Sequence, residues 1–447
     1  MTRSAKGVPH SLPGSRLEST FADAKPPLSH SEALIEANRC LYCHDAPCIS
    51  ACPTGIDIPT FIRKIATGNL RGSARTLFEA NMMGVSTARV CPVEELCVGA
   101  CVYNRLNDKP IQIGQLQRYA TARALELEEN SSRPLFTPAG DRKRKVALVG
   151  AGPASLACAS YLALEGVAAI IFDKGDLPGG LNTTGVAPYK YQTEDSLKEI
   201  AWIESHGVEI RTGVAVGEDP TLAALIEEYD AVFLGLGLGA DRMVGMPGED
   251  GPGVWGATDL IREIKNRPDF TIPQGVDTVL VIGGGNTAID IARELAMLGA
   301  GEVTIVYRRT EAEMPAYAHE LEGARRYGVH LRERLKPAEI IRNGESVKAL
   351  KVTDLDSRRE VELPCDWVVS AIGQEKITSV LVPEVQLDDR GCVVVDAQTR
   401  QTGHPKVYAG GDCINGGKEV VDAAADGREA AFAMLRSWGY EPVLARK

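Results

Sequence analysis

The chain has 447 residues, of which 44% are hydrophobic and 24% are charged, and these proportions are typical of a soluble globular protein. Its length is sufficient for two or three domains with sizeable cores. A formal net charge of -11 at pH 7 argues against nucleic acid or an anionic membrane surface as the main partner. The opening stretch MTRSAKGVPHSLPGSRLEST has no apolar segment, so no secretory signal is predicted and we expect a cytoplasmic protein.

The first part of the chain is predicted to be a tail followed by a helical domain. Residues 1–28 are rich in Ser, Pro and Gly without periodicity, which is typical of a mobile tail. Apolar residues then recur at helical spacing up to about residue 127, with little strand character. Together with the linker ENSSRPLFTPAGDRKRK, this pattern predicts a small helical domain over residues 29–140.

Seven of the eleven cysteines lie in this helical domain. In a reducing compartment, clustered cysteines are more often metal ligands or redox groups than disulfides. His44, inside the first run, is predicted to be a surface residue. The other four cysteines are expected to be small buried side chains. The clustered cysteines are Cys40, Cys43, Cys48, Cys52, Cys91, Cys97 and Cys101, and the scattered ones are Cys158, Cys365, Cys392 and Cys413.

The spacing of the first four cysteines, which end in a Cys-Pro pair, is close to the bacterial ferredoxin pattern with one gap widened by two residues. In two-cluster ferredoxins the cysteine before the proline ligates the other cluster. By that logic Cys52 joins Cys91 and Cys97. Cys101 then completes the group of Cys40, Cys43 and Cys48.

Two [4Fe-4S] clusters need eight ligands and the domain supplies seven cysteines. Either one position is open or a group other than cysteine fills it. Zinc is the main alternative, because Cys-x2-Cys is also a zinc-binding pattern. Zinc sites usually combine two similar pairs, however, and the second half of this domain has none.

The sequence after the linker predicts an α/β fold. KVALVGAG and TVLVIGGG are continuous apolar runs that break into glycines and then an apolar helix, as in strands buried on both faces of a parallel sheet. The uncharged stretch from Val146 to Leu164 is long enough to cross a bilayer, but GAGPAS divides it into strand, turn and helix. We therefore expect an FAD-binding domain, over residues 141–262 and 386–447, interrupted by an NAD(P)H-binding domain over 263–385.

The first glycine motif is predicted to bind FAD. Its glycines allow a tight turn and a close approach of the backbone to a pyrophosphate, while the following helix offers free N–H groups to the anion. Asp173 is spaced to bind an adenosine ribose, and PGGL and VYAGGDC are typical of flavoprotein reductases. The alternative is a Rossmann fold without a cofactor. The predicted site comprises Gly150, Ala151, Gly152, Pro153, Ala154, Ser155, Asp173, Lys174, Gly180, Leu181, Gly411 and Asp412.

The second motif is predicted to bind NAD(P)H. Its second strand, EVTIVYRRT, ends in Arg308 and Arg309 instead of the acid that would accept the 2′-hydroxyl of NADH. Arginines suit a 2′-phosphate, which favours NADPH. NADH stays possible if both arginines are merely solvated, and Glu311 and Glu313 lie close in sequence. The predicted site comprises Gly283, Gly284, Gly285, Asn286, Thr287, Arg308, Arg309, Ala371, Ile372 and Gly373.

Taken together, these stretches resemble the amino-terminal half of dihydropyrimidine dehydrogenase and the separate flavoprotein subunit of the bacterial enzyme. The small subunits of glutamate synthase are similar more widely. The resemblance runs from about residue 30 to the end. It rests on CHDAPC, CPTGID, RVCP, LCVGAC, IGQLQRYA and GAGPAS, which occur in the expected order and spacing.

The resemblance implies the same grouping of cysteines and supplies an eighth ligand, Gln117, in IGQLQRYA. Pattern alone would make Gln117 a helix-surface residue. Glutamate synthase small subunits usually carry a glutamate there, so the glutamine favours the pyrimidine enzyme, whereas YRRTEAEMPA is more similar to the glutamate synthase group. The long dehydrogenase continues into an FMN-bearing barrel that touches the pyrimidine, and this sequence stops at Lys447 without it.

The resemblance implies an electron-input subunit of a dihydropyrimidine dehydrogenase. NAD(P)H would pass hydride to FAD, and single electrons would leave through two [4Fe-4S] clusters to a partner containing FMN and iron–sulfur clusters, which interconverts uracil or thymine and their dihydro forms. The helix in VVDAAADGREAA is expected to aim its positive amino end at the flavin. No protein nucleophile or acid–base pair is predicted.

Two alternatives to this function remain open. The first is a glutamate synthase-type small subunit, or an orphan relative that feeds another acceptor. The second is a redox-sensing or assembly module that binds cofactors without turnover.

Overall fold

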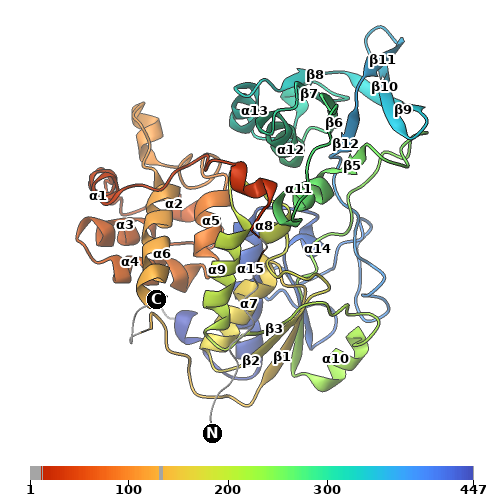
Figure 1. Ribbon diagram of the computed structural model, residues 1–447. Coiled ribbons are helices and arrows are strands. Elements are labelled where there is room, and N and C mark those ends of the chain that lie inside the picture. Colours follow the sequence, from red (N-terminus) through yellow and green to blue (C-terminus); the bar gives the residue numbers. More distant parts are fainter. Residues whose placement is uncertain (1–11, 13, 130–133, 446–447) are drawn as a thin grey trace.

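The computed structural model describes residues 12, 14–129 and 134–445. Its first part is the predicted helical domain, drawn in red to orange in Figure 1. The buried apolar faces of α1, α3 and α6 meet in one core. The α-helices of this domain are α1 (His30–Asn38), α2 (Pro47–Ser50), α3 (Ile58–Ala66), α4 (Leu70–Ala80), α5 (Gly84–Val90) and α6 (Ile113–Glu129), and the 3-10 helix η2 (Val102–Leu106) precedes α6.

The second part is a five-stranded parallel sheet in the order β13-β4-β1-β2-β3. Its central strands are buried on both faces, as the apolar runs predicted. The strands are β1 (Lys145–Val149), β2 (Ala168–Phe172), β3 (Glu209–Arg211), β4 (Ala231–Leu234) and β13 (Val407–Ala409). The helices are α7 (Pro153–Leu164), α8 (Leu181–Thr184), α9 (Thr193–Glu204), α10 (Leu222–Glu228), α14 (Asp412–Asn415) and α15 (Val420–Ser437).

The third part is a second parallel sheet, β5-β12-β6-β7-β8, with a three-stranded antiparallel sheet, β11-β10-β9, beside it at the upper right of Figure 1. Its helices are α11 (Ala257–Asn266), α12 (Asn286–Met297) and α13 (Ala318–Arg325). Its strands are β5 (Val254–Gly256), β6 (Thr278–Ile282), β7 (Glu302–Val306), β8 (His330–Arg332), β9 (Leu335–Asn343), β10 (Ser346–Asp354), β11 (Glu360–Pro364) and β12 (Trp367–Ser370).

As predicted, one α/β unit is interrupted by another, but both boundaries of the inserted unit differ from the predicted residues. The expected start at residue 263 is corrected, because β5 pairs with β12 and Leu260 of α11 packs in the core of the second sheet. A three-residue strand has too little periodicity to be detected in a sequence. The expected end at 385 is also late, since Leu381 and Val385 pack in the core of the first sheet.

The segment from residue 14 to residue 28 is not the predicted mobile tail. Phe21 is 5% exposed and packs in the same core cluster as Tyr189, next to the 3-10 helix η1 (Leu17–Thr20). The buried Glu18 carboxylate accepts hydrogen bonds from the backbone N–H and hydroxyl of Thr193. One aromatic anchor and one buried acid leave no periodic signal, so the pattern was misread. Residues 1–11 and 13 of the predicted tail lie outside the described residues.

Two other predictions from the apolar pattern are confirmed. Val146–Leu164 folds as β1, a turn and α7, and among the described residues no helix combines the length and apolarity that a bilayer crossing requires. The four scattered cysteines, Cys158, Cys365, Cys392 and Cys413, are buried.

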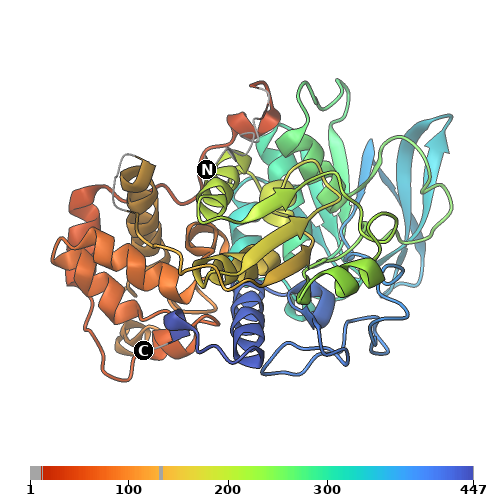
Figure 2. The same cartoon turned by 90° about the horizontal axis from the view of Figure 1, so that it is seen from below.

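Helix α15 joins the helical domain to the first sheet. It packs directly on α7, because a Cβ at Gly427 would overlap the carbonyl oxygen of Ala154. The next residue, Arg428, donates hydrogen bonds to the carbonyl oxygens of Thr54 (2.6 Å) and Ala80 (2.8 Å) in the helical domain. In Figure 2 α15 is the central blue helix, beside the orange helices.

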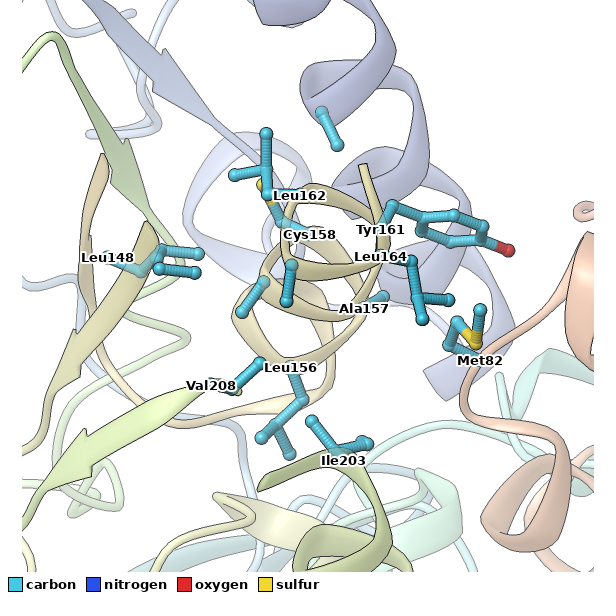
Figure 3. Close-up of a cluster of buried hydrophobic side chains, with 14 of the residues drawn as sticks. Met82, Leu148, Leu156, Ala157, Cys158, Tyr161, Leu162, Leu164, Ile203 and Val208 are labelled. Atoms are coloured by element: carbon cyan, nitrogen blue, oxygen red, sulfur yellow. The ribbon is translucent and has the colours of Figure 1, made fainter. Parts of the chain in front are cut away.

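The core around α7 is shared between the two domains as well. Figure 3 shows Leu156, Leu162 and Tyr161 leaving α7 in different directions, with Met82 of the helical domain close to Tyr161. The Tyr161 hydroxyl donates to the carbonyl oxygen of Glu79 at 3.2 Å. The helical domain is therefore held on the first sheet by apolar packing and by hydrogen bonds to its backbone carbonyl groups.

Replacing Gly427 with alanine tests the close packing of α15 on α7. We expect Gly427→Ala to lower the free energy of unfolding by about 1–2 kcal/mol, because over-packing a tight contact costs up to about 3 kcal/mol and alanine's higher helix propensity offsets only roughly 1 kcal/mol of that cost. Urea unfolding followed by circular dichroism measures it. Gly403→Ala is the control, since nothing lies within 4 Å of a Cβ added there. Equal stability of the two variants would contradict the packing argument.

Candidate functional site

The first group of cysteines lines one cavity in the helical domain. The chain leaves α1 into the Cys40–Cys43 loop, where Tyr42 has a φ of 52°, and turns into α2 at Pro47. The rest of the cavity wall is mainly apolar, from residues such as Ile58 and Ile62. Burial, together with the neighbouring Cys40 and Cys101, raises the pKa of Cys48 to about 12. The four cysteines on this cavity are Cys40, Cys43, Cys48 and Cys101.

The second cavity is lined by Cys52, Cys91, Cys97 and Gln117. The Gln117 amide is buried, and its Nε2 donates to the Gly84 carbonyl oxygen (2.9 Å) and to Thr87 Oγ1 (3.0 Å). Among the described residues no donor reaches its Oε1, which leaves that oxygen for a ligand. Burial, followed by the nearby Cys52, raises the pKa of Cys97 to about 12. The residue implied only by the family resemblance thus lies beside the three predicted cysteines.

The two cavities are neighbours, and one of them reaches α15. Ile58 lines both, while Val421, in the first turn of α15, lines the second cavity alone. Within residues 14–129 and 134–445, no three His, Cys, Asp or Glu side chains are grouped to hold a single metal ion. Each group of cysteines instead lines a cavity, where an iron–sulfur cluster would be held by their thiolates.

The first glycine loop has the geometry of a phosphate-binding turn. Gly150 has a φ of +89°, and a Cβ there would lie 2.5 Å from the carbonyl oxygen of Gly235. A Cβ on Gly180 would lie 3.0 Å from the Cα of Gly152, so the PGGL segment packs on the loop. Gly152 is the N-cap of α7, and no side chain of the described residues caps that helix. Its free N–H groups are therefore open to an anion.

Asp173 lies at this loop as predicted, with a contact that the sequence did not suggest. Its carboxylate accepts hydrogen bonds from the backbone N–H groups of Ala151 (2.5 Å) and Gly175 (2.7 Å). Asp173 therefore holds the glycine loop in place, and Lys174 is exposed. Ser155 Oγ is buried, has no hydrogen-bond partner within the part of the chain that the structure describes, and would collide with a Cβ on Gly235.

The late VYAGGDC motif lies against the same loop. A Cβ on Gly411 would lie 3.2 Å from the Cβ of Ala154, at the start of α7. The Gly411 N–H donates to Asp426 Oδ2 at 2.9 Å, and burial raises the pKa of Asp412. Asn182, one residue after the predicted Leu181, is 1% exposed, and both polar atoms of its amide lack a partner among the described residues. An orphaned amide beside this loop fits a polar cofactor such as FAD.

The second glycine loop has similar geometry. Gly283 has a φ of +147°, and a Cβ there would overlap the Ala371 carbonyl oxygen, so the predicted 371–373 segment lies beside the loop. A Cβ on Gly284 would overlap the ring of Tyr307. Asn286 and Thr287 open α12, whose N-cap is Gly285.

Arg308 and Arg309 follow β7 and are both exposed. Among the described residues neither forms an ion pair. The two acids near them are occupied elsewhere: Glu311 pairs with Arg325 at 2.6 Å and Glu313 accepts from Thr310. The Arg309 guanidinium lies over the Tyr307 ring, 5.6 Å from its centroid. Neither guanidinium donates a hydrogen bond to any residue that the structure describes, so the donors of both are open to a ligand.

These features define an iron–sulfur flavoprotein that works with pyridine nucleotides. Residues 17–129 match the family model for dihydropyrimidine dehydrogenase domain II, 4Fe-4S cluster, and residues 144–427 match the pyridine nucleotide-disulphide oxidoreductase model. The chain belongs to the pyridine nucleotide-disulphide oxidoreductase family and is an NAD(P)H-dependent oxidoreductase. A binding module without turnover is therefore set aside.

Two groups of curated relatives are similar over nearly their whole length. The glutamate synthase [NADPH] small chain of Escherichia coli K12 is 33% identical over 93% of this chain and 93% of its own. The NAD-dependent dihydropyrimidine dehydrogenase subunit PreT of the same strain is 35% identical over 90% of this chain and 93% of its own. Both groups were expected from the motifs, and that resemblance is confirmed.

A solved structure supports the fold. Thioredoxin reductase of T. acidophilum is 25% identical with a TM-score of 0.55, and it covers 66% of this chain and 99% of its own.

The two cavities predict which cysteines act together. Cys101→Ala and Cys97→Ala each remove one sulfur from a different cavity, so we expect each variant, purified without oxygen, to keep about half of the wild-type iron because only one cluster loses a ligand. Iron and sulfide analysis measures this loss. After chemical reduction, electron paramagnetic resonance should show a different remaining signal in each variant. Identical remaining signals would contradict the grouping.

Proposed function

We propose that this chain is the electron-input subunit of a cytoplasmic dihydropyrimidine dehydrogenase. It takes hydride from NAD(P)H and delivers single electrons, through two [4Fe-4S] clusters, to a partner subunit that contains FMN and iron–sulfur clusters. The partner interconverts uracil or thymine and their 5,6-dihydro forms. The observation that carries the proposal is the cavity that combines Cys52, Cys91 and Cys97 with Gln117.

The order of the sites supports a continuous route for electrons. The start of α15 lies between the Gly411 loop and the second cavity, since Val421 lines that cavity. Burial raises the pKa of Cys91, with smaller contributions from Glu419 and Asp422 on either side of Val421. Burial likewise raises the pKa of Cys97, with smaller contributions from Cys52 and from Cys48 of the first group. The order is therefore flavin loop, second cavity, first cavity. Leu41, on the first cavity, is 51% exposed, so this end of the route is open to a partner.

The chain holds and insulates these groups and does no acid–base chemistry of its own. FAD, when bound, supplies the conversion between a hydride pair and single electrons. Gly150, Gly152 and Gly180 leave room for the pyrophosphate, and the start of α7 offers N–H groups to it. Isoleucines such as Ile58 and Ile62 keep water from the sulfurs. Gln117 would hold its cluster as a neutral ligand and would leave it less negative than four thiolates do, which would change the reduction potential.

Gln117 and the PreT relatives favour the pyrimidine partner. The glutamate synthase small subunits that the sequence resembles usually have glutamate at this position. A second candidate, a glutamate synthase-type small subunit, is favoured by Arg308 and Arg309, which suit the 2′-phosphate of NADPH. The relative whose name includes NADPH is a glutamate synthase small chain, whereas the PreT relatives are named NAD-dependent.

Reconstitution with each partner decides between the two functions. The chain is co-expressed with the FMN-containing subunit of a dihydropyrimidine dehydrogenase or with a glutamate synthase large subunit, purified without oxygen, and supplied with NADH or NADPH. We expect a stable complex only with the first partner, with nucleotide oxidation dependent on uracil or thymine and reversed by dihydrouracil. Glutamate formation from glutamine and 2-oxoglutarate in the second complex would establish the alternative.

The arginine pair predicts a preference for NADPH. We expect the double variant Arg308→Ala with Arg309→Ala to raise KM for NADPH at least tenfold, since each charge-assisted hydrogen bond to phosphate contributes roughly 1.5–3 kcal/mol. KM for NADH should stay within about twofold, because NADH has no 2′-phosphate for these side chains to bind. Steady-state kinetics with ferricyanide as acceptor measures both constants. Arg326→Ala, on an exposed ion pair, is the control. An equal rise for NADH and NADPH would remove the arginines from the phosphate site.

A further inference from the structure

The segment Met314–Glu320 lies over the second glycine loop. The N–H of Ala316 donates to the Gly284 carbonyl oxygen at 3.2 Å, and the N–H of Tyr317 donates to Asn286 Oδ1 at 3.0 Å. Asn286 is the first residue of α12, where the predicted pyrophosphate site begins. The position of Tyr317 is therefore fixed by the loop that holds the dinucleotide.

The same segment reaches the other two domains. The Tyr317 hydroxyl donates to Glu419 Oε1 at 2.7 Å, and Glu419 is the N-cap of α15. The His319 ring stacks on the Tyr317 ring, with centroids 5.8 Å apart and an angle of 4° between the planes. Its Nε2 lies 3.7 Å from the carboxylate of Glu94, between Cys91 and Cys97. One short segment thus links the nucleotide loop, α15 and the cysteine loop.

The Tyr317–Glu419 hydrogen bond connects the nucleotide domain to the start of α15. Burial, followed by the nearby Glu419 carboxylate, raises the pKa of Tyr317, so its hydroxyl stays protonated and remains a donor. Glu419 is partly buried and burial raises its pKa, so this carboxylate needs a donor. Because the tyrosine ring is rigid, this contact also fixes the Tyr317 backbone, whose N–H donates a hydrogen bond to Asn286 Oδ1.

We propose that Tyr317 is a positioning residue for hydride transfer, whose bond to Glu419 docks the NAD(P)H-binding domain on the amino end of α15. Hydride transfer requires the nicotinamide and flavin rings to lie within a few tenths of an ångström of the reactive geometry. The Tyr317–Glu419 hydrogen bond joins the two domains that would hold these rings. Tyr317 exchanges no proton or electron in this role. The proposal goes beyond the assignment of a partner subunit, because it concerns the reduction of the flavin by NAD(P)H, which needs no partner.

Amide hydrogen exchange tests the Tyr317–Glu419 hydrogen bond without turnover. In the oxidised holoprotein, Tyr317→Phe removes only the hydroxyl, Glu419→Ala removes the acceptor, and Glu419→Gln keeps an acceptor oxygen. We expect the first two variants to speed amide exchange across residues 314–321 about tenfold, which corresponds to ~1.4 kcal/mol of lost local stability. Glu419→Gln should restore most of the protection. Tyr327→Phe, on a tyrosine that is 47% exposed, is the matched control. Unchanged exchange in Tyr317→Phe would overturn the proposal.

Stopped-flow reduction of the flavin by NAD(P)H separates positioning from a general structural role. We expect Tyr317→Phe and Glu419→Ala to lower the limiting rate about tenfold while the nucleotide dissociation constant stays within about twofold. The double variant should be no slower than either single variant, since both remove the same bond. Additive losses, or a loss confined to the dissociation constant, would overturn the proposal. Neither readout involves an acceptor protein, so an error in the partner assignment leaves both results unchanged.

Discussion

The close packing of α15 on α7 is the constraint on which the arrangement of sites depends. Gly427 lets the two helices touch, and Arg428 ties the same helix to the helical domain. The first turn of α15 then falls between the Gly411 loop and the second cysteine cavity. The helix contacts all three domains, because Glu419 at its start receives the bond from Tyr317. A shift of this one helix would change every distance along the proposed electron route.

Buried charges hold the nucleotide domain on the first sheet. Lys265 of α11 is fully buried, and its Nζ donates to the carbonyl oxygens of Val186 and Tyr191, both at 2.8 Å. Burial lowers the pKa of this amine to about 8, while the carboxylates of Glu18, 3.8 Å away, and Glu294 favour its charged form. Nearby, Lys190 pairs with Asp290 of α12 at 2.7 Å. These contacts are polar and specific, which favours one orientation of the two units.

The electrostatics at the start of α15 differ from the simple helix-dipole expectation. The positive amino end of the helix carries Glu419 and Asp422, which oppose the attraction that a helix end exerts on an anion. Tyr317 donates to the first of these carboxylates. The amino end of α15 is therefore contacted by the nucleotide domain, an arrangement that the pattern VVDAAADGREAA alone does not reveal.

Local sequence patterns predicted most of the strands, helices and glycine loops discussed above, but they could not predict contacts between segments far apart in the chain. Apolar runs ending in glycines predicted β1, α7, β6 and α12, because a buried parallel strand and a phosphate loop each leave a short, regular signal. Gln117 was found through family motifs, since no periodicity separates a buried glutamine from an exposed one. Tyr317 and Glu419 were missed, because their contact joins residues far apart in the chain, and no pattern distinguishes the buried Asn182 from an exposed asparagine. The ordered segment around Phe21 was missed for the same reason.

The most direct test of the account is the response of the clusters to NAD(P)H with and without flavin. The protein is purified without oxygen, part of it is stripped of FAD with its iron content verified, and both samples are mixed with NAD(P)H and frozen for electron paramagnetic resonance. The account predicts that clusters are reduced only in the flavin-containing sample, and that FAD added back restores reduction. Rapid cluster reduction without flavin would contradict the route past α15.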